Sequence, residues 1–360
     1  MQTMKRSKII NDLCTLVSIQ SCSYETGRMM KHIGNVVQSI QGCTTSTDSY
    51  GNLYVTKGDG PYKAMVCHTD TVHDIVKAKV LPVKVKGNII AINSKTMKQI
   101  GTGGDDKCGI AITLQLLKTQ SSMKAVFFLD EEVGCLGSSK LKKKFFNDCL
   151  YVLQCDRRGA DDFVNRISGT KLYEENFQDA IKYILQKYNR VEVNGGMTDV
   201  LEIAYKTDLP VANMSCGYYN PHTDTEYINI NDFVETYKLC SDIFKYINTK
   251  YVVKTKRESY NYHMYGRYND YDWNYNSHMM YDHVFDEDQL SEAEKKIKII
   301  CGTGCGMYDG YCDACMVSAE EAIEFYLEED EQNELYTKLP TVGAPIQIGP
   351  KNPSMDDEQR

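Results

Sequence analysis

Short apolar segments alternate with helix-like segments through the first 250 residues, and this alternation limits the folds available to the chain. The strand-like segments are NLYVT, KAMVCH, AVFFLD, YVLQCD and PVANMSC. Apolar residues recur at helical spacing over residues 9–19, 29–40, 110–117, 141–146, 177–188 and 232–247. Because strands that are apolar throughout must be covered on both faces, the pattern predicts an α/β fold with a mixed, mostly parallel central sheet and helices on both faces. Residues 79–92 instead predict a hairpin around Lys86-Gly87-Asn88.

The composition changes at about residue 252, where Tyr, Asn and Asp replace the aliphatic residues. We therefore predict a main α/β domain over residues 1–250 and a Tyr/Asn-rich linker over residues 251–289. A small Cys-rich and acidic helical module is expected over residues 290–340, followed by a tail over residues 341–360.

Charge, cysteine usage and hydropathy limit the compartment and the partners. The formal net charge of −8 argues against nucleic-acid binding. The 14 cysteines are mostly scattered singly, as expected for free thiols in a reducing compartment. The N-terminus lacks the apolar run of a signal peptide, and no segment is long and apolar enough to span a membrane. A cytoplasmic protein with no membrane association is the expectation.

Potential metal ligands follow several of the strand-like segments. These residues are His68 and Asp70 after KAMVC, Asp105 in GTGGDDKCG, Glu131 and Glu132 after AVFFLD, Asp156 after YVLQC, and His222 after PVANMSC. Because ligands gather beyond the carboxyl ends of strands in an open α/β sheet, these side chains are expected to meet. Imidazoles and carboxylates suit zinc or a similar divalent ion. Ligands from these five positions are too many for one tetrahedral ion, so the set suits a pair of ions that share one carboxylate.

Five motifs, HTDTV, GTGGDDKCG, DEEVG, QCDRRG and NPHTDTEY, occur here in the order found in the co-catalytic dizinc exopeptidases. Residues 1–250 thus resemble the catalytic domain of that superfamily, which includes peptidase T and the zinc aminopeptidases. The resemblance implies two Zn²⁺ ions, or other divalent ions such as Co²⁺ or Mn²⁺. It implies that Asp105 bridges both ions, that Glu132 and His222 complete the ligands of one, and that His68 and Asp156 complete those of the other.

The resemblance also assigns two residues that are not ligands. Asp70 would orient the ring of His68, and Glu131 would be the general base that takes a proton from the attacking water. A cis peptide bond is expected between Asp105 and Asp106. Asp130, the first of the three adjacent carboxylates, receives no role.

Motif spacing and the identity of the fourth ligand refine the expected activity. Only residues 157–221 separate the fourth motif's Asp156 from His222, which is too short for the lid domain that some members insert there. Asp rather than Glu at position 156 resembles aminopeptidases and di- or tripeptidases. The resemblance therefore implies a metallopeptidase that removes N-terminal residues from small peptides.

Other interpretations remain open at this stage. Each motif alone is equally consistent with a loop, a helix N-cap or a solvated strand end. The domain would then be a non-catalytic binding scaffold, whereas a catalytic rival is a dizinc amidohydrolase or deacylase that acts on a small acylated substrate. His73 is either a surface histidine or a residue at the mouth of the site. Residues 194–199 and 217–219 either line the substrate pocket or serve only as turns.

Four thiols lie close together in the C-terminal part: Cys301, Cys305, Cys312 and Cys315. They would coordinate a structural Zn²⁺ tetrahedrally, although the central spacing is shorter than in a zinc ribbon. The alternative is a Cys-rich turn with free thiols. In either case a protein partner is possible for this module, and its acidic helix argues against nucleic acid.

Overall fold

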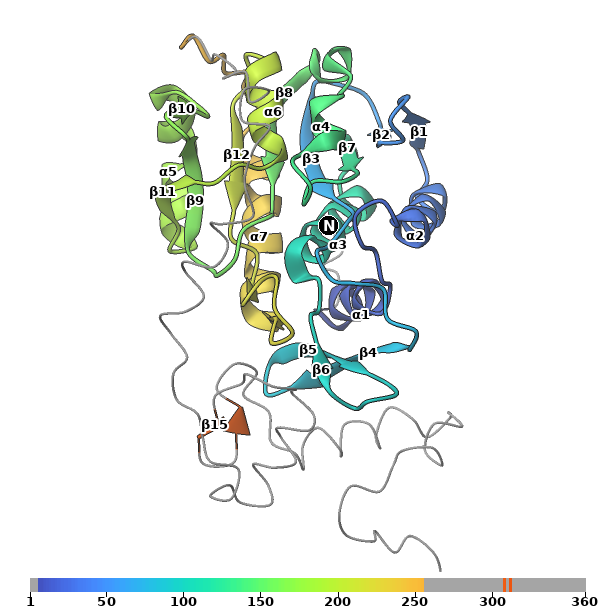
Figure 1. Cartoon of the computed structure of the whole chain (residues 1–360). Helices are drawn as coiled ribbons and strands as arrows, with labels where there is room; N and C mark the ends of the chain where they lie inside the picture. The colour runs from blue at the N-terminus through green and yellow to red at the C-terminus, as the bar shows by residue number, and fades with distance from the viewer. Residues whose placement is uncertain (1–5, 256–306, 309–310, 313–360) are drawn as a thin grey trace, which may run out of the picture.

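A nine-stranded mixed sheet forms the centre of the molecule in the computed structural model, which describes residues 6–255, 307–308 and 311–312 (Figure 1). The strand order is β1-β2-β7-β3-β8-β12-β9-β10, and β11 pairs with β9. The strands are β1 (Cys43–Thr47), β2 (Leu53–Lys57), β3 (Tyr62–His68), β7 (Met123–Phe128), β8 (Cys149–Gln154), β9 (Asp162–Ile167), β10 (Thr170–Lys171), β11 (Val191–Gly195) and β12 (Val211–Met214). The central strands β7, β3, β8 and β12 run parallel, whereas β2 and β9 pair antiparallel at the two sides of this group. The predicted α/β fold is confirmed.

Helices cover both faces of this sheet. They are α1 (Arg6–Val17), α2 (Gly27–Gln38), α3 (Gly104–Thr119), α4 (Leu136–Ser139), α5 (Glu175–Lys187), α6 (Asp199–Lys206) and α7 (Ile230–Tyr246). Helix α3 packs on β3 and β7 and is flanked by α1, α2 and α7, while α6 packs on β3, β8 and β12 together with α4. Helix α3 is buried along most of its length, which fixes its N-terminal end at the sheet edge where the parallel strands stop.

The helix predicted over residues 141–146 is wrong. Helix α4 ends before it, at Ser139, and only a single 3-10 turn forms over Lys143–Phe146. The chain must re-enter the sheet at Cys149, so no room remains for a longer helix. Phe145 and Phe146 stack edge-to-face in this turn, which explains why the apolar pattern was present without an α-helix.

A second, smaller sheet lies beside the main one and carries loops of the site. It is built from β4 (Val80–Val85), β5 (Asn88–Asn93), β6 (Gln99–Ile100), β13 (Tyr218–Tyr219) and β14 (Tyr227–Asn229). Strands β4 and β5 form the predicted hairpin. Strand β14 pairs with β5, so the loop between β13 and β14 is held next to the loop that leads into α3. Residues 157–221 form β9 to β13, α5 and α6, and β9 to β12 all join the main sheet rather than a separate lid.

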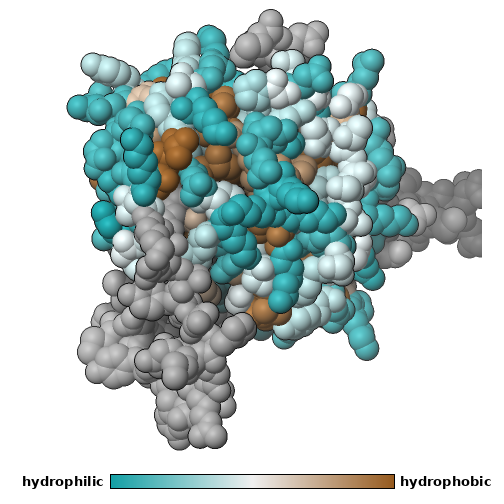
Figure 2. Space-filling model, turned by 90° about the horizontal axis from the view of Figure 1, so that it is seen from above, coloured by the Kyte–Doolittle hydropathy of each residue, from teal (hydrophilic) through white to brown (hydrophobic). Residues whose placement is uncertain are grey.

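The surface of the described part is mainly hydrophilic on the face in Figure 2, where hydrophobic side chains show as separate brown areas. Residues 251–255 still belong to the packed structure: the ring of Tyr251 contacts that of Phe177, and the backbone N–H of Val253 donates to the Asp208 carbonyl. Within the described ranges, none of the helices has both the length and the apolar character needed to cross a membrane.

The predicted linker beyond residue 255, most of the Cys-rich module and the tail lie outside the described residues. The same is true of Cys301, Cys305 and Cys315. Cys312 belongs to the two-residue strand β16 (Tyr311–Cys312), which pairs with β15 (Met307–Tyr308).

Candidate metal centre

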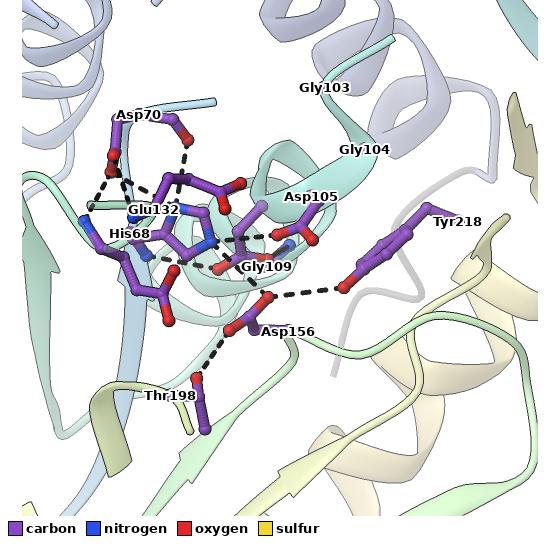
Figure 3. A network of polar contacts seen from close by, with 12 residues as sticks. His68, Asp70, Gly103, Gly104, Asp105, Gly109, Glu132, Asp156, Thr198 and Tyr218 are labelled. Carbon is purple, nitrogen blue, oxygen red and sulfur yellow. Dashed lines mark hydrogen bonds and ion pairs between the residues drawn. The ribbon is translucent and has the colours of Figure 1, made fainter. Parts of the chain in front are cut away.

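The predicted ligands converge beyond the carboxyl ends of the parallel strands (Figure 3). His68 ends β3, Glu132 follows β7, and Asp156 follows β8, and these three strands are neighbours in the sheet. Asp105 lies at the start of α3, and His222 lies on the loop between β13 and β14. Residues that are far apart in the sequence are therefore brought together by the strand order.

Asp105 lies between the two histidines and presents a different oxygen to each. His68 Nε2 is 3.0 Å from Asp105 Oδ1, and His222 Nε2 is 3.4 Å from Asp105 Oδ2. On the first side, His68 Nε2 is also 3.5 Å from Asp156 Oδ1. On the second side, His222 Nε2 is 3.3 Å from Glu132 Oε2. The ligands thus form two subgroups that share Asp105.

These residues fit a divalent cation by their chemistry. Ligand atoms of His68, Asp105 and Glu132 all lie within 4.8 Å of one another. Oε1 of Glu132 is buried and has no hydrogen-bond partner among the described residues. A buried carboxylate oxygen without a donor is costly unless a cation balances it. The donor set of imidazole nitrogen and carboxylate oxygen is the one that zinc accepts.

The two histidines experience the negative potential of this cluster. Burial disfavours the imidazolium form of His68, but Asp156 and Asp105 outweigh burial and hold the pKa of His68 well above its usual value. Contacts with Asp105 and Glu132 raise the pKa of His222 to about 10. Both rings therefore lie where positive charge is strongly favoured.

At two carboxyl groups of the cluster, burial outweighs the other effects and favours the neutral form. Desolvation, helped by the neighbouring Asp105, raises the pKa of Asp156 to about 7. Desolvation also raises the pKa of Glu131 well above its usual value, although His68 opposes this shift. Carboxylates that resist ionisation in this way mark a site where the chain alone supplies too little positive charge.

Asp70 connects the segment of β3 to the segment of β7. Its two oxygens accept hydrogen bonds from the backbone N–H of Glu131 at 3.0 Å and of Glu132 at 3.2 Å. Its carboxylate is 3.4 Å from His68 Nδ1, but the closer partner of that nitrogen is the backbone carbonyl of Asp70, at 3.0 Å. Ser23 donates a further hydrogen bond to Asp70. Asp70 is therefore placed to orient the DEE segment as well as the His68 ring.

Asp130, which received no role from the sequence, fixes the turn after β7. Its φ of 56° lies in the left-handed region, and its carboxylate accepts from the backbone N–H of Tyr24 and from the hydroxyl of Tyr50. These contacts anchor the turn from which Glu131 and Glu132 extend. Cys135 Sγ lies 3.4 Å from Glu131 Oε1.

The start of α3 has the backbone that the resemblance implied. The peptide bond between Asp105 and Asp106 is cis. The Asp106 carboxylate accepts from the backbone N–H of Gly109 at 2.9 Å and of His68 at 3.3 Å. Asp106 is thus engaged by backbone donors, whereas the Asp105 side chain faces the histidines.

Sequence reasoning missed the residues that hold Asp156. Thr198 Oγ1 donates to Asp156 Oδ2 at 2.7 Å, and the Tyr218 hydroxyl donates to Asp156 Oδ1 at 3.4 Å (Figure 3). Both residues lie in segments that the sequence predicts as pocket or turn segments, but nothing in these segments indicates contact with a predicted metal ligand. His73 is partly buried and contacts Glu226.

Comparisons with known proteins give the same fold. No protein-family model matches the chain, and no curated protein matches it. Several solved structures match the chain in fold. Aminopeptidase PepT from Bacillus cereus ATCC 10987 matches 68% of this chain and 99% of its own, with 14% identity and a TM-score of 0.57. A tripeptidase from Staphylococcus aureus subsp. aureus mu50 matches 67% and 98%, with 14% identity and a TM-score of 0.54.

An aminopeptidase from the archaeon Desulfurococcus kamchatkensis matches 68% of this chain and 96% of its own, with 14% identity and a TM-score of 0.51. The chain has the fold of these peptidases. The predicted likeness in fold to aminopeptidases and tripeptidases is thereby confirmed. At this identity the likeness concerns the fold alone, so the activity must be argued from the site.

Proposed function

We propose that the chain is a metal-dependent exopeptidase that hydrolyses N-terminal residues from small peptides, as an aminopeptidase or a di- or tripeptidase. The observation that carries the proposal is the position of Asp105, with one oxygen toward His68 and the other toward His222. Two subgroups of ligands that share one carboxylate suit a two-metal hydrolytic site.

These contacts support a division of the proposed ligands between two ions. His68 and Asp156 would hold one ion, Glu132 and His222 would hold the other, and Asp105 would serve both. Zn²⁺ suits these donors, and Co²⁺ or Mn²⁺ are alternatives. When bound, such ions activate water as a nucleophile at neutral pH and stabilise negative charge on the carbonyl oxygen.

Glu131 supplies the proton transfer in this proposal. Its carboxylate takes a proton from the attacking water and delivers it to the nitrogen of the leaving amine. Burial raises the pKa of Glu131 well above the usual value, which makes its carboxylate a stronger base than one in water. Asp70, by accepting from the backbone N–H of Glu131, limits the positions that this side chain can reach.

The direction of cleavage rests on two supports. Asp at position 156, rather than Glu, resembles the aminopeptidases and di- or tripeptidases of the superfamily. The solved structures with the same fold include proteins named aminopeptidase and tripeptidase. Residues 157–221 form no separate lid, so a short substrate with a free amino end fits the proposal.

The test is hydrolysis of tripeptides and aminoacyl-anilides compared with N-acetylated forms of the same compounds. We expect cleavage only of the forms with a free amino group, complete loss after chelation, and recovery on addition of Zn²⁺ or Co²⁺. Preference for the N-acyl forms would instead identify a deacylase. Absence of hydrolysis in the metal-loaded chain would leave a binding scaffold and contradict the proposal.

A further inference from the structure

The carboxylate of Glu226 lies next to the cluster of predicted metal ligands, but no hydrogen bond joins it to their side chains. Glu226 is fully buried, and it precedes β14 on the same loop as His222. We infer that Glu226, together with His73, is a positioning residue that fixes the backbone of Asp105. This inference rests on the proposed function, because it assigns to Asp105 the shared place in a metal centre.

Both oxygens of Glu226 bind the segment that carries Asp105. Oε1 accepts from the backbone N–H of Asp105 at 3.2 Å, and Oε2 accepts from the backbone N–H of Gly103 at 2.6 Å. His222, four residues earlier on the Glu226 loop, approaches the side chain of the same Asp105. One loop therefore contacts Asp105 at two points: Glu226 binds its peptide N–H, and His222 approaches its carboxylate.

His73 completes the link to the strand that ends in His68. Its Nε2–H donates to Glu226 Oε2 at 2.9 Å, and the imidazole is 21% exposed. His73 lies on the loop that follows β3 and includes Asp70. Glu226 thus joins three segments of the centre: the loop after β3, the loop into α3, and its own loop.

The glycines of the GTGG segment permit these close approaches. A Cβ on Gly101 would overlap the His73 ring. A Cβ on Gly104 would lie 2.6 Å from Tyr218 Cβ and 3.3 Å from Glu226 Oε1. The segment that leads into α3 is therefore shaped to receive the partners that hold Asp105; Figure 3 labels Gly103 and Gly104 of this segment.

The chemistry requires a carboxylate at position 226. Each oxygen accepts from at least one backbone N–H, so the amide of a glutamine would direct its NH₂ group at a donor in either orientation. Glu226→Gln therefore keeps the size of the side chain but leaves a buried N–H of Gly103 or Asp105 without an acceptor. His73→Phe keeps a ring over Gly101 and removes only the hydrogen bond.

The experiment is zinc titration of the metal-free full chain in competition with a chromogenic chelator. Loss of a residue that orients a metal ligand typically weakens affinity by roughly 10- to 100-fold. We expect a loss of this size for Glu226→Gln and a smaller loss, roughly tenfold or less, for His73→Phe. In metal-saturated protein, kcat should fall while KM for a tripeptide stays near the wild-type value, since the substrate contacts are intact.

Glu192→Gln is the matched control. Glu192 also accepts a hydrogen bond on each oxygen, from the side chains of Tyr173 and Gln178, but it lies on β11 at the far side of the sheet. Its variant should lose stability without losing zinc affinity. Circular dichroism of each variant checks the fold, and His73→Phe tests the inference alone if Glu226→Gln does not fold.

Wild-type zinc affinity in folded Glu226→Gln and His73→Phe would overturn the inference and leave the proposed function intact. A wild-type chain that binds no zinc would contradict both. A zinc loss in Glu192→Gln as large as that in Glu226→Gln would also overturn the inference, because the effect would then be general destabilisation.

Discussion

Two regions of the molecule differ in how many hydrogen-bond donors the chain supplies to their carboxylates. In the turn between β1 and β2, Asp48 accepts hydrogen bonds from the backbone N–H of Tyr50, Gly51 and Asn52. The Asn52 side chain and the Tyr54 hydroxyl donate to its other oxygen. In the candidate metal centre, by contrast, carboxylates face one another and two histidines, and a buried oxygen of Glu132 receives no hydrogen bond from any residue described in the structure.

The pKa directions follow this difference. Burial tends to raise the pKa of Asp48, but the donors of Asn52, Tyr54 and Gly51 outweigh it and lower the pKa. Burial prevails at Asp156 and Glu131, whose pKa values are raised. A carboxylate whose donors are built into the chain is a structural element. A buried group of carboxylates with too few donors suits a bound cation, because the cation would balance their charge.

The largest expected effect is on catalysis, at Glu131, where burial raises the pKa of the carboxyl group. Glu131→Gln keeps the shape of the side chain but cannot take a proton. We expect kcat for a tripeptide to fall by roughly 10²- to 10⁴-fold, the usual contribution of a general base, while the metal content stays unchanged. Glu175→Gln, an exposed glutamate on α5, is the control. Unchanged kcat in Glu131→Gln would remove Glu131 as the base.

At Asp48 the expected effect is on stability instead. Asp48→Asn removes one carboxylate oxygen and the charge that the donors of this turn stabilise, at a cost of about 1–3 kcal/mol in the free energy of unfolding. Zinc content and kcat should not change. Urea denaturation at pH 7 measures the loss. A variant as stable as the wild type would show that the hydrogen bonds to the Asp48 carboxylate do not stabilise the fold.

The stability from Asp48 should also depend on pH in a defined direction. Because the folded-state pKa is lowered, the contribution is fully present above the ordinary aspartate pKa of about 4 and is lost as the pH falls through the lower folded value. The difference in unfolding free energy between wild type and Asp48→Asn should therefore shrink between pH 5 and about pH 3. A difference that grows on acidification would contradict this sign.

The smallest expected effect concerns a single hydrogen bond to a ligand. Thr198→Val is nearly isosteric and removes the donor to Asp156 Oδ2. We expect a loss of about 1 kcal/mol, equivalent to roughly fivefold in zinc affinity. Thr44→Val, at an exposed position of β1 where the hydroxyl donates to the Thr56 carbonyl, is the matched control. Equal zinc affinity in both variants would show that Asp156 holds its position without Thr198.

The sequence predicted the fold and the convergence of the site for a clear physical reason. Apolar segments such as KAMVCH and AVFFLD are periodic, and parallel neighbours must end at the same edge of a sheet. The contacts of Thr198, Tyr218 and Glu226 were not predictable, because these residues lie in loops or in a two-residue strand, where no periodic pattern indicates which side chains meet. The helix predicted over residues 141–146 failed for a related reason: its apolar pattern serves ring packing in a single 3-10 turn.

Metal analysis of the purified full chain and of Asp105→Asn tests the central claim most directly. We expect about two zinc ions per wild-type chain at the cluster, as in two-metal hydrolytic sites, and a loss of both in the variant. A further ion that persists in Asp105→Asn would belong to the Cys-rich module over residues 290–340. Equal zinc content in wild type and Asp105→Asn would contradict the account, because the carboxylate between His68 and His222 would then hold no metal.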